Sequence, residues 1–177
     1  KLQKVDISIK PSQLGLLIHP LLSYRHIEFL AKMANLRGHT VRLDMEDSSV
    51  TELTRNLAIS LNKKYGNVGV AILLRTPQDL QLLIKNNVSV RLVKGAYKEA
   101  SEIAHQTETN VNLAFFDYAA SLVGENKPAI GTHDQELLDD VTEILPNPKQ
   151  FDYEFLYGIR RDVQKRMRDE GYKVRVY

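Results

Sequence analysis

The strongest constraint on the fold of this 177-residue chain is a regular alternation of strand-like and helix-like segments. The strand-like segments are residues 5–10, 40–47, 68–73, 88–94, 128–133, 151–159 and 173–177. A helical pattern follows each of the first six. In residues 23–38, for example, apolar side chains recur at Ile27, Leu30 and Ala34. Strict alternation of this kind predicts a parallel sheet whose strands are connected by helices.

Two arrangements of such a sheet are common, a barrel and an open, doubly wound sheet. No G-x-G-x-x-G motif follows any strand-like segment, which weakens the doubly wound alternative. Seven strands with intervening helices suit a (β/α)₈ TIM-type barrel that lacks its first strand and its last helix. We therefore expect an α/β fold in which residues 1–177 form a single, incomplete barrel domain.

The composition excludes several classes of protein. The chain has 24 basic and 22 acidic residues, so no charge excess indicates binding to nucleic acid. The absence of cysteine excludes disulfides, thiolate metal sites and a cysteine nucleophile. No apolar run approaches the ~20 residues that span a bilayer, and the N-terminus has no signal-peptide pattern. We expect a cytoplasmic protein, with peripheral membrane contact as an option.

Polar side chains, with one glycine, share one face at the ends of four predicted strands, and they form the candidate site. They are Ser8 and Lys10; Arg42, Asp44 and Glu46; Ser89 and Arg91; and Gly131 and His133. In a barrel these faces converge at the C-terminal mouth, where barrel enzymes place their chemistry. Arg91 is the most informative, because a lone guanidinium in a buried strand is costly unless it is paired. We expect it to face Asp44, Glu46 or an anionic ligand.

Each of these residues also has a structural interpretation, in which it does no chemistry. The alternatives are a solvated strand end for Lys10, helix N-termini for Asp44, Glu46, Asp47 and Asp134, a structural ion pair for Arg91, a structural contact for His133, and turns for Gly95 and Gly131. The set has neither a second nearby histidine nor a dense carboxylate cluster, so we expect no metal. The pattern alone predicts a barrel site for a charged small molecule or a cofactor.

At these same residues the sequence resembles the proline dehydrogenase family of flavin-dependent barrel enzymes. The matching motifs are SIKPSQLG (8–15), RLDMEDSS (42–49), RLVKGAYKE (91–99), AIGTHD (129–134), LYGIRRD (156–162) and GYKVRVY (171–177). They span almost the whole chain, and the combination of RLVKGAY with the aspartate motif and THD is specific. The resemblance implies a (β/α)₈ barrel that holds FAD at its C-terminal face.

The resemblance also implies a reaction, the oxidation of L-proline to 1-pyrroline-5-carboxylate. A hydride leaves the ring carbon beside the nitrogen for flavin N5, and the electrons then pass to a quinone-type acceptor. By motif matching, the catalytic residues are Asp44 and Arg91, the substrate-binding residues are Lys10, Tyr97 and Tyr177, and the flavin-binding residues are Met45, Arg91, Lys94, Gly95, Ala96, Thr132 and His133. A cation near N5 suits this chemistry because it stabilises the anionic reduced flavin.

The sequence departs from the family pattern at both ends and at two internal points. The first barrel strand is absent from residues 1–177, as is the last helix, which carries the paired arginines of the substrate clamp. Ile72 runs directly into Leu73, where the family usually has a Gln-Ala-Tyr-like insert. Phe155 meets Leu156, where the family usually has two more residues. These departures predict that this chain alone neither holds FAD tightly nor oxidises proline at a useful rate.

Other interpretations therefore stay open. One is a non-catalytic fragment of the same family, which keeps the fold but binds no substrate. Another is a barrel lyase that uses Lys10 or Lys94 as a Schiff-base amine. A third, a module that binds phosphorylated sugars, rests only on the stretch LVKGA at 92–96.

Overall fold

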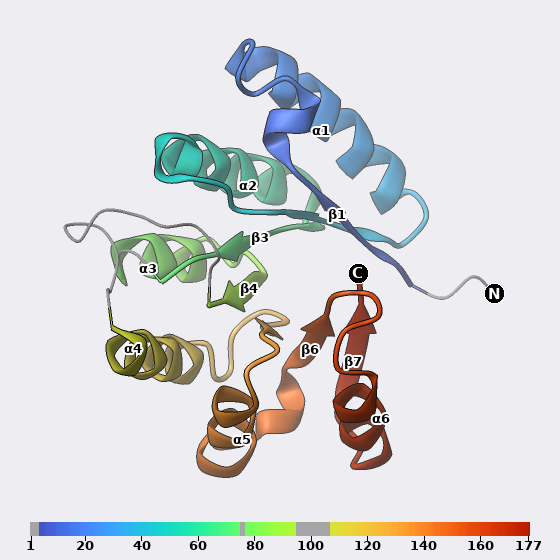
Figure 1. The fold of residues 1–177 in the computed structure, drawn as a ribbon. Helices are drawn as coiled ribbons and strands as arrows, with labels where there is room; N and C mark the ends of the chain where they lie inside the picture. Colours follow the sequence, from blue (N-terminus) through green and yellow to red (C-terminus); the bar gives the residue numbers. More distant parts are fainter. Residues whose placement is uncertain (1–3, 75–76, 95–106) are drawn as a thin grey trace.

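The computed structural model describes residues 4–74, 77–94 and 107–177. Its seven strands are β1 (Asp6–Ile9), β2 (Thr40–Leu43), β3 (Val68–Ile72), β4 (Val90–Val93), β5 (Ala129–Gly131), β6 (Asp152–Phe155) and β7 (Lys173–Val176). All neighbouring pairs are parallel, and the strands follow one another in sequence order across a single sheet. A doubly wound sheet would reverse its strand order at a switch point. The barrel-type prediction is therefore confirmed, as a curled sheet of seven strands (Figure 1).

The helices lie outside the curve of this sheet (Figure 1). They are α1 (Pro20–Asn35), α2 (Thr51–Tyr65), α3 (Pro77–Lys85), α4 (Glu108–Ser121), α5 (Gln135–Ile144) and α6 (Arg161–Asp169), with short 3₁₀ turns η1 (Pro11–Leu14), η2 (Ser48–Val50) and η3 (Pro148–Gln150). The described helices are each too short or too polar to cross a membrane.

Helix caps explain where the predicted elements stop. The predicted strand 40–47 ends at Leu43, because the Asp47 carboxylate caps η2 by accepting a hydrogen bond from Ser49 N at 2.9 Å. The serine start predicted for the next helix thus becomes η2, and α2 begins at Thr51. The Asp134 carboxylate accepts from the backbone N–H groups of two residues at the start of α5, so its predicted N-cap role is confirmed.

The two faces of the sheet differ in chemistry because successive side chains of a strand point to opposite faces. The outer face is apolar and packs on the helices; in β2, for example, Val41 and Leu43 are fully buried. The inner face carries buried charges, of which Arg42 in β2 and Arg91 in β4 are the largest. A barrel interior this polar needs internal ion pairs, and these determine the site.

A side-chain ion pair links the two edge strands beside the first residue of β1. Arg175 on β7 reaches Asp6 on β1, with Nη1 3.2 Å from Oδ2, and its Nη2 lies 3.0 Å from Asp152 Oδ2 on β6. The sheet order nevertheless ends at β1 and β7, so they are joined by side chains and are not paired as strands. The predicted unpaired edges are thus present, linked by an ion pair.

Candidate functional site

Arg91 is the centre of the site. Its side chain is almost fully buried, and each guanidinium nitrogen has its own partner, on β6, in the loop after β2 and on β1. Nε donates to Glu154 Oε2 at 2.5 Å, Nη1 to Asp44 Oδ1 at 2.8 Å and Nη2 to Ser8 Oγ at 2.8 Å. The Tyr177 ring covers the guanidinium, with its centroid 4.2 Å from Cζ. The expectation that Arg91 faces Asp44 is confirmed, and the guanidinium is held in one orientation.

The expected alternative partner of Arg91, Glu46, lies elsewhere. Its carboxylate accepts from Ser12 N at 3.0 Å and from Ser12 Oγ, so it ties the start of η1 to the loop after β2. The structure continues as a loop after Leu43, and the alternation that would have put Glu46 beside Asp44 ends there.

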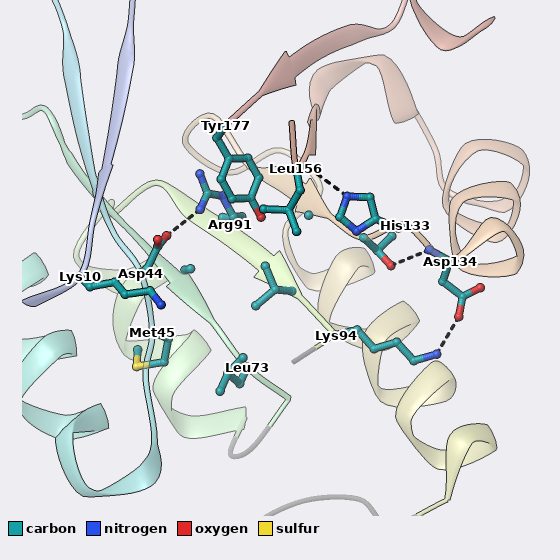
Figure 2. Close-up of a pocket in the computed structure, with 14 residues that line it drawn as sticks. Lys10, Asp44, Met45, Leu73, Arg91, Lys94, His133, Asp134, Leu156 and Tyr177 are labelled. Carbon is teal, nitrogen blue, oxygen red and sulfur yellow. Dashed lines mark hydrogen bonds and ion pairs between the residues drawn. The ribbon is translucent and has the colours of Figure 1, made fainter. Parts of the chain in front are cut away.

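A cavity of about 480 Å³ opens above Arg91 at the C-terminal ends of the strands (Figure 2). Its lining residues come from all seven strands or the loops after them: Lys10, Asp44, Met45, Ala71, Leu73, Arg91, Val93, Lys94, Gly131, Thr132, His133, Asp134, Leu156 and Tyr177. Eight residues predicted for the site are thus brought together: Lys10, Asp44, Met45, Arg91, Lys94, Thr132, His133 and Tyr177. The remaining predicted residues, Gly95, Ala96 and Tyr97, lie outside the described residues.

The two lysines at the rim differ in their surroundings. Lys94 Nζ lies 2.7 Å from Asp134 Oδ2 and 3.3 Å from Glu108 Oε1. Partial burial opposes its charge, but these two carboxylates more than compensate and raise the pKa of Lys94. The Lys10 side chain is exposed, and its ammonium makes no hydrogen bond or ion pair with another described residue (Figure 2). Lys10 is therefore the cation most available to an incoming anion.

The negative charge of Asp44 is disfavoured at this partly buried position. Burial raises its pKa above the usual value, and the charges of Arg91 and Lys10 oppose that rise only in part. Burial likewise raises the pKa of the Tyr177 hydroxyl. A carboxyl group whose ionisation is disfavoured, at the wall of a cavity, is a typical feature of functional sites.

His133 accepts one hydrogen bond at its ring and one at its backbone carbonyl. Its Nε2 accepts a hydrogen bond from Leu156 N at 3.0 Å, so the neutral ring carries its proton on Nδ1. Burial and then the nearby Arg160 lower the pKa of His133, which favours this neutral form. Arg160 Nη1 also donates to His133 O at 2.8 Å and fixes the loop after β5. The ring can thus present one N–H donor at the cavity wall.

Gly131 does more than serve a turn, which was the structural interpretation of this residue. It lies within β5, where a Cβ atom would come 2.9 Å from Val93 Cγ1 and 3.2 Å from Arg91 Cδ. A side chain at this position would therefore press on the stem of Arg91. The absence of a side chain leaves room for the arginine inside the barrel.

Glu154 is the residue that the sequence-based prediction missed. It is buried on the inner face of β6 and holds Arg91 from below the cavity. The period-two alternation of the segment DYEF already puts Asp152 and Glu154 on one face. That signal was present, but the prediction considered only polar residues at strand ends.

The described residues hold no group of three or more metal-ligating side chains. The arrangement is instead a cavity with an apolar wall, a buried cation at its base and a lysine at each side. It can bind a planar or anionic molecule and stabilise negative charge that develops near Arg91.

Comparisons with known proteins point to one family. The sequence model of the proline dehydrogenase family matches residues 1–177. The chain belongs to this family. Proline dehydrogenase 1 of Bacillus subtilis (strain 168) is 29% identical over 180 residues, which cover 97% of this chain and 60% of that protein. Proline dehydrogenase 2 of the same strain is 32% identical, covering 97% of this chain and 59% of that protein. The chain thus spans about three fifths of the length of these proline dehydrogenases.

Solved structures support the fold of this member of the proline dehydrogenase family. Proline utilization A (PutA) from Bdellovibrio bacteriovorus, inactivated by N-propargylglycine, matches with a TM-score of 0.79 and 21% identity, over 96% of this chain and 22% of that one. A variant of PutA from Bradyrhizobium japonicum matches with a TM-score of 0.81 and 19% identity, over 97% and 22% of the two chains. At these identities the likeness establishes the architecture alone.

Proposed function

We propose that this chain forms most of the barrel of an FAD-dependent proline dehydrogenase, which oxidises L-proline to 1-pyrroline-5-carboxylate. The observation that carries the proposal is the convergence of Lys10, Asp44, Arg91 and Tyr177 on one cavity, in a chain of this family. Barrel enzymes keep their active sites at this end of the strands.

The chemistry of the cavity fits a flavin. One part of its lining is apolar and suits a flat ring system: Met45, Ala71, Leu73, Val93 and Leu156. The volume of about 480 Å³ lies in the range of small-molecule and cofactor sites. FAD, when bound, would supply the acceptor for the hydride. Met45, Arg91, Lys94, Thr132 and His133 would hold it, with Gly95 and Ala96 contributing backbone N–H groups to its phosphates.

Three features suit proline. The Lys10 ammonium makes no hydrogen bond or ion pair with a described residue, so it is available for the substrate carboxylate. The Tyr177 ring borders the cavity beside Arg91 and offers an apolar face to a five-membered ring. Asp44 lies between Arg91 and Lys10, where a carboxyl with a raised pKa can hold the polar end of the substrate. Tyr97 is proposed as a further contact with the substrate.

The electron acceptor and the location follow from the family resemblance. We infer a quinone-type acceptor, which takes the two electrons removed from proline. Quinones reside in membranes, so a cytoplasmic enzyme with peripheral membrane contact suits this transfer. No contact with nucleic acid is expected, given the balanced charge of the chain.

The raised pKa of Lys94 argues against the Schiff-base alternative at that residue. A lysine nucleophile must be neutral, which requires a lowered pKa. Lys94 instead pairs with Asp134 and Glu108, and these carboxylates favour the charged form.

The deciding experiment is reconstitution of the purified chain with excess FAD. Because this chain alone is expected to hold FAD weakly, excess FAD stays present throughout: we expect a shifted flavin spectrum at equilibrium, and slow loss of flavin absorption when L-proline is added without oxygen. D-proline is the matched control and should leave the spectrum unchanged. Failure to bind any FAD would favour the non-catalytic fragment. Borohydride trapping of a carbonyl substrate on Lys10 would favour the lyase.

A further inference from the structure

Glu154 lies between the two buried arginines of the barrel interior. It is 2% exposed, and its Oε2 accepts from Arg91 Nε at 2.5 Å. Its Oε1 lies 3.8 Å from Arg42 Nη2 and has no hydrogen-bond partner among the described residues. A buried carboxylate with one oxygen unsatisfied is costly, so its retention here calls for a role.

The geometry separates Glu154 from the other two partners of Arg91. Asp44 lines the cavity and Ser8 lies on β1, and both bind the terminal nitrogens. Glu154 is not among the described residues that line the cavity, and it binds Nε, the nitrogen nearest the stem of the side chain. A ligand that competes for Asp44 would therefore leave the Glu154 contact in place. Glu154 is the partner that can hold the guanidinium plane while a ligand binds or leaves.

We propose that Glu154 is a positioning residue for Arg91, which fixes the plane of its guanidinium and reduces the positive charge that it presents to the cavity. This second effect deepens the proposed function, since that charge would face the flavin. The first effect, on the plane of the guanidinium, rests only on the contacts between Glu154 and Arg91 and does not depend on the proposed function.

Two conservative substitutions separate the effect of the length of the Glu154 side chain from the effect of its negative charge. Glu154→Gln keeps an oxygen that can accept from Arg91 Nε, but it removes the negative charge. Glu154→Asp keeps the charge, but it shortens the side chain by one methylene and withdraws the acceptor from Nε. Asp152→Asn is the matched control, because Asp152 lies on the same strand and pairs with Arg175 at 3.0 Å.

The first measurement is the hydrogen exchange of Arg91 Nε–H by NMR in the chain without flavin. A buried, hydrogen-bonded N–H exchanges slowly. We expect exchange to accelerate about tenfold or more in Glu154→Asp and to stay within about threefold of the wild type in Glu154→Gln and Asp152→Asn. Unchanged exchange in Glu154→Asp would overturn the positioning role.

The second measurement is the titration of the Asp44 carboxyl by NMR in the same samples. Glu154 and Asp44 share the charge of Arg91, so removing the charge of Glu154 leaves more of it for Asp44. We expect the proton affinity of Asp44 to fall about tenfold in Glu154→Gln and to change less than about twofold in Glu154→Asp. A residue that only stabilises the fold would not produce these opposite responses, and identical behaviour of both variants would overturn the proposal. Neither measurement uses flavin, so a failure of the proposed function is detected separately, as absence of FAD binding.

Discussion

The tripeptide Val-Arg-Leu occurs twice in this barrel, at residues 41–43 in β2 and 90–92 in β4. In both strands the arginine points into the barrel interior and is buried, with 4% of Arg42 and 2% of Arg91 exposed. Each donates to an aspartate: Arg42 Nε to Asp6 at 3.0 Å, and Arg91 Nη1 to Asp44 at 2.8 Å. Identical local sequence has therefore produced two similar ion pairs.

The two arginines differ in their height along the barrel axis. On β3, Arg42 is level with Gly69, whereas Arg91 is level with Ala71, two residues nearer the C-terminal end. Arg91 consequently lines the main cavity, and Arg42 lines a much smaller one at the opposite end. Stagger between strands, a property of the whole sheet, has separated a structural arginine from a candidate functional one.

Their aspartates show the same division. Burial opposes the ionisation of Asp6, but the charge of Arg42 and hydrogen bonds from Thr40 and Arg42 lower its pKa. Burial raises the pKa of Asp44, and Arg91 does not fully compensate. In the Arg42–Asp6 pair, the favourable interactions thus outweigh the cost of burying the carboxylate. In the Arg91–Asp44 pair they do not. A buried ion pair alone does not mark a site; an incompletely compensated one beside a cavity does.

The largest effect is expected from removing each arginine. Arg91→Met and Arg42→Met each leave a buried carboxylate uncompensated, so each should lower the free energy of unfolding by about 3–5 kcal/mol. Only Arg91→Met should also abolish FAD retention, because only Arg91 faces the main cavity. Urea unfolding and FAD titration of both variants test this. Equal loss of FAD in the two variants would mean that Arg91 is no more important for ligand binding than Arg42.

The next prediction concerns the two aspartates, whose contributions to stability should have opposite signs. Asp6 has a lowered pKa, so its stabilisation is present above pH 3.8 and is lost as the pH falls through its pKa in the folded chain. Asp44 has a raised pKa, so its stabilisation is present below pH 3.8 and is lost as the pH rises through its folded pKa.

At neutral pH, Asp6→Asn should therefore cost about 1.5–3 kcal/mol of unfolding free energy, the typical value of a hydrogen bond to a charged group. Asp44→Asn should instead raise the free energy of unfolding by about 0.5–1 kcal/mol. Residues kept for function often reduce stability, so replacing them can stabilise the fold. Urea unfolding at several pH values measures both. A destabilising Asp44→Asn would mean that Asp44 is as structural as Asp6.

The sequence was sufficient to predict the fold and most of the candidate site. Period-two and helical patterns located every strand and helix to within a few residues, because each pattern is local. The shared face of Lys10, Asp44, Arg91 and His133 predicted their convergence, since parallel strands end at one edge of a sheet. The residue pattern alone could not distinguish the two Val-Arg-Leu segments, because strand stagger depends on contacts between distant segments; only the family resemblance selected Arg91. Glu154 was missed because it lies in the middle of the predicted strand 151–159 and not at its end, although the alternation in DYEF puts it on the inner face.

A smaller effect should separate the two glycines that accommodate these arginines. A Cβ at Gly69 would come 2.7 Å from Ser89 O, a backbone atom, and 3.2 Å from Arg42 Nη1. At Gly131 the nearest atom belongs to the Val93 side chain, which can move. We expect Gly69→Ala to cost about 2 kcal/mol and Gly131→Ala about 1 kcal/mol. Thermal unfolding of both variants is the measurement, and the reverse order would contradict this packing.

The smallest effect on stability is expected at the rim, where Lys94 pairs with Asp134 at 2.7 Å. Both side chains are about one quarter exposed, so water screens the pair. Lys94→Gln should cost no more than about 0.5–1 kcal/mol, and 1 M salt should remove most of that difference. Its effect on FAD affinity should be larger than its effect on unfolding, because Lys94 is proposed to face the cofactor phosphates. Lys64→Gln is the control: Lys64 forms an exposed pair with Glu28 on the outer helices, remote from the cavity. If Lys94→Gln and Lys64→Gln bound FAD equally well, the rim lysine would be a surface ion pair like the other, and ligand binding would rest on the residues around Arg91.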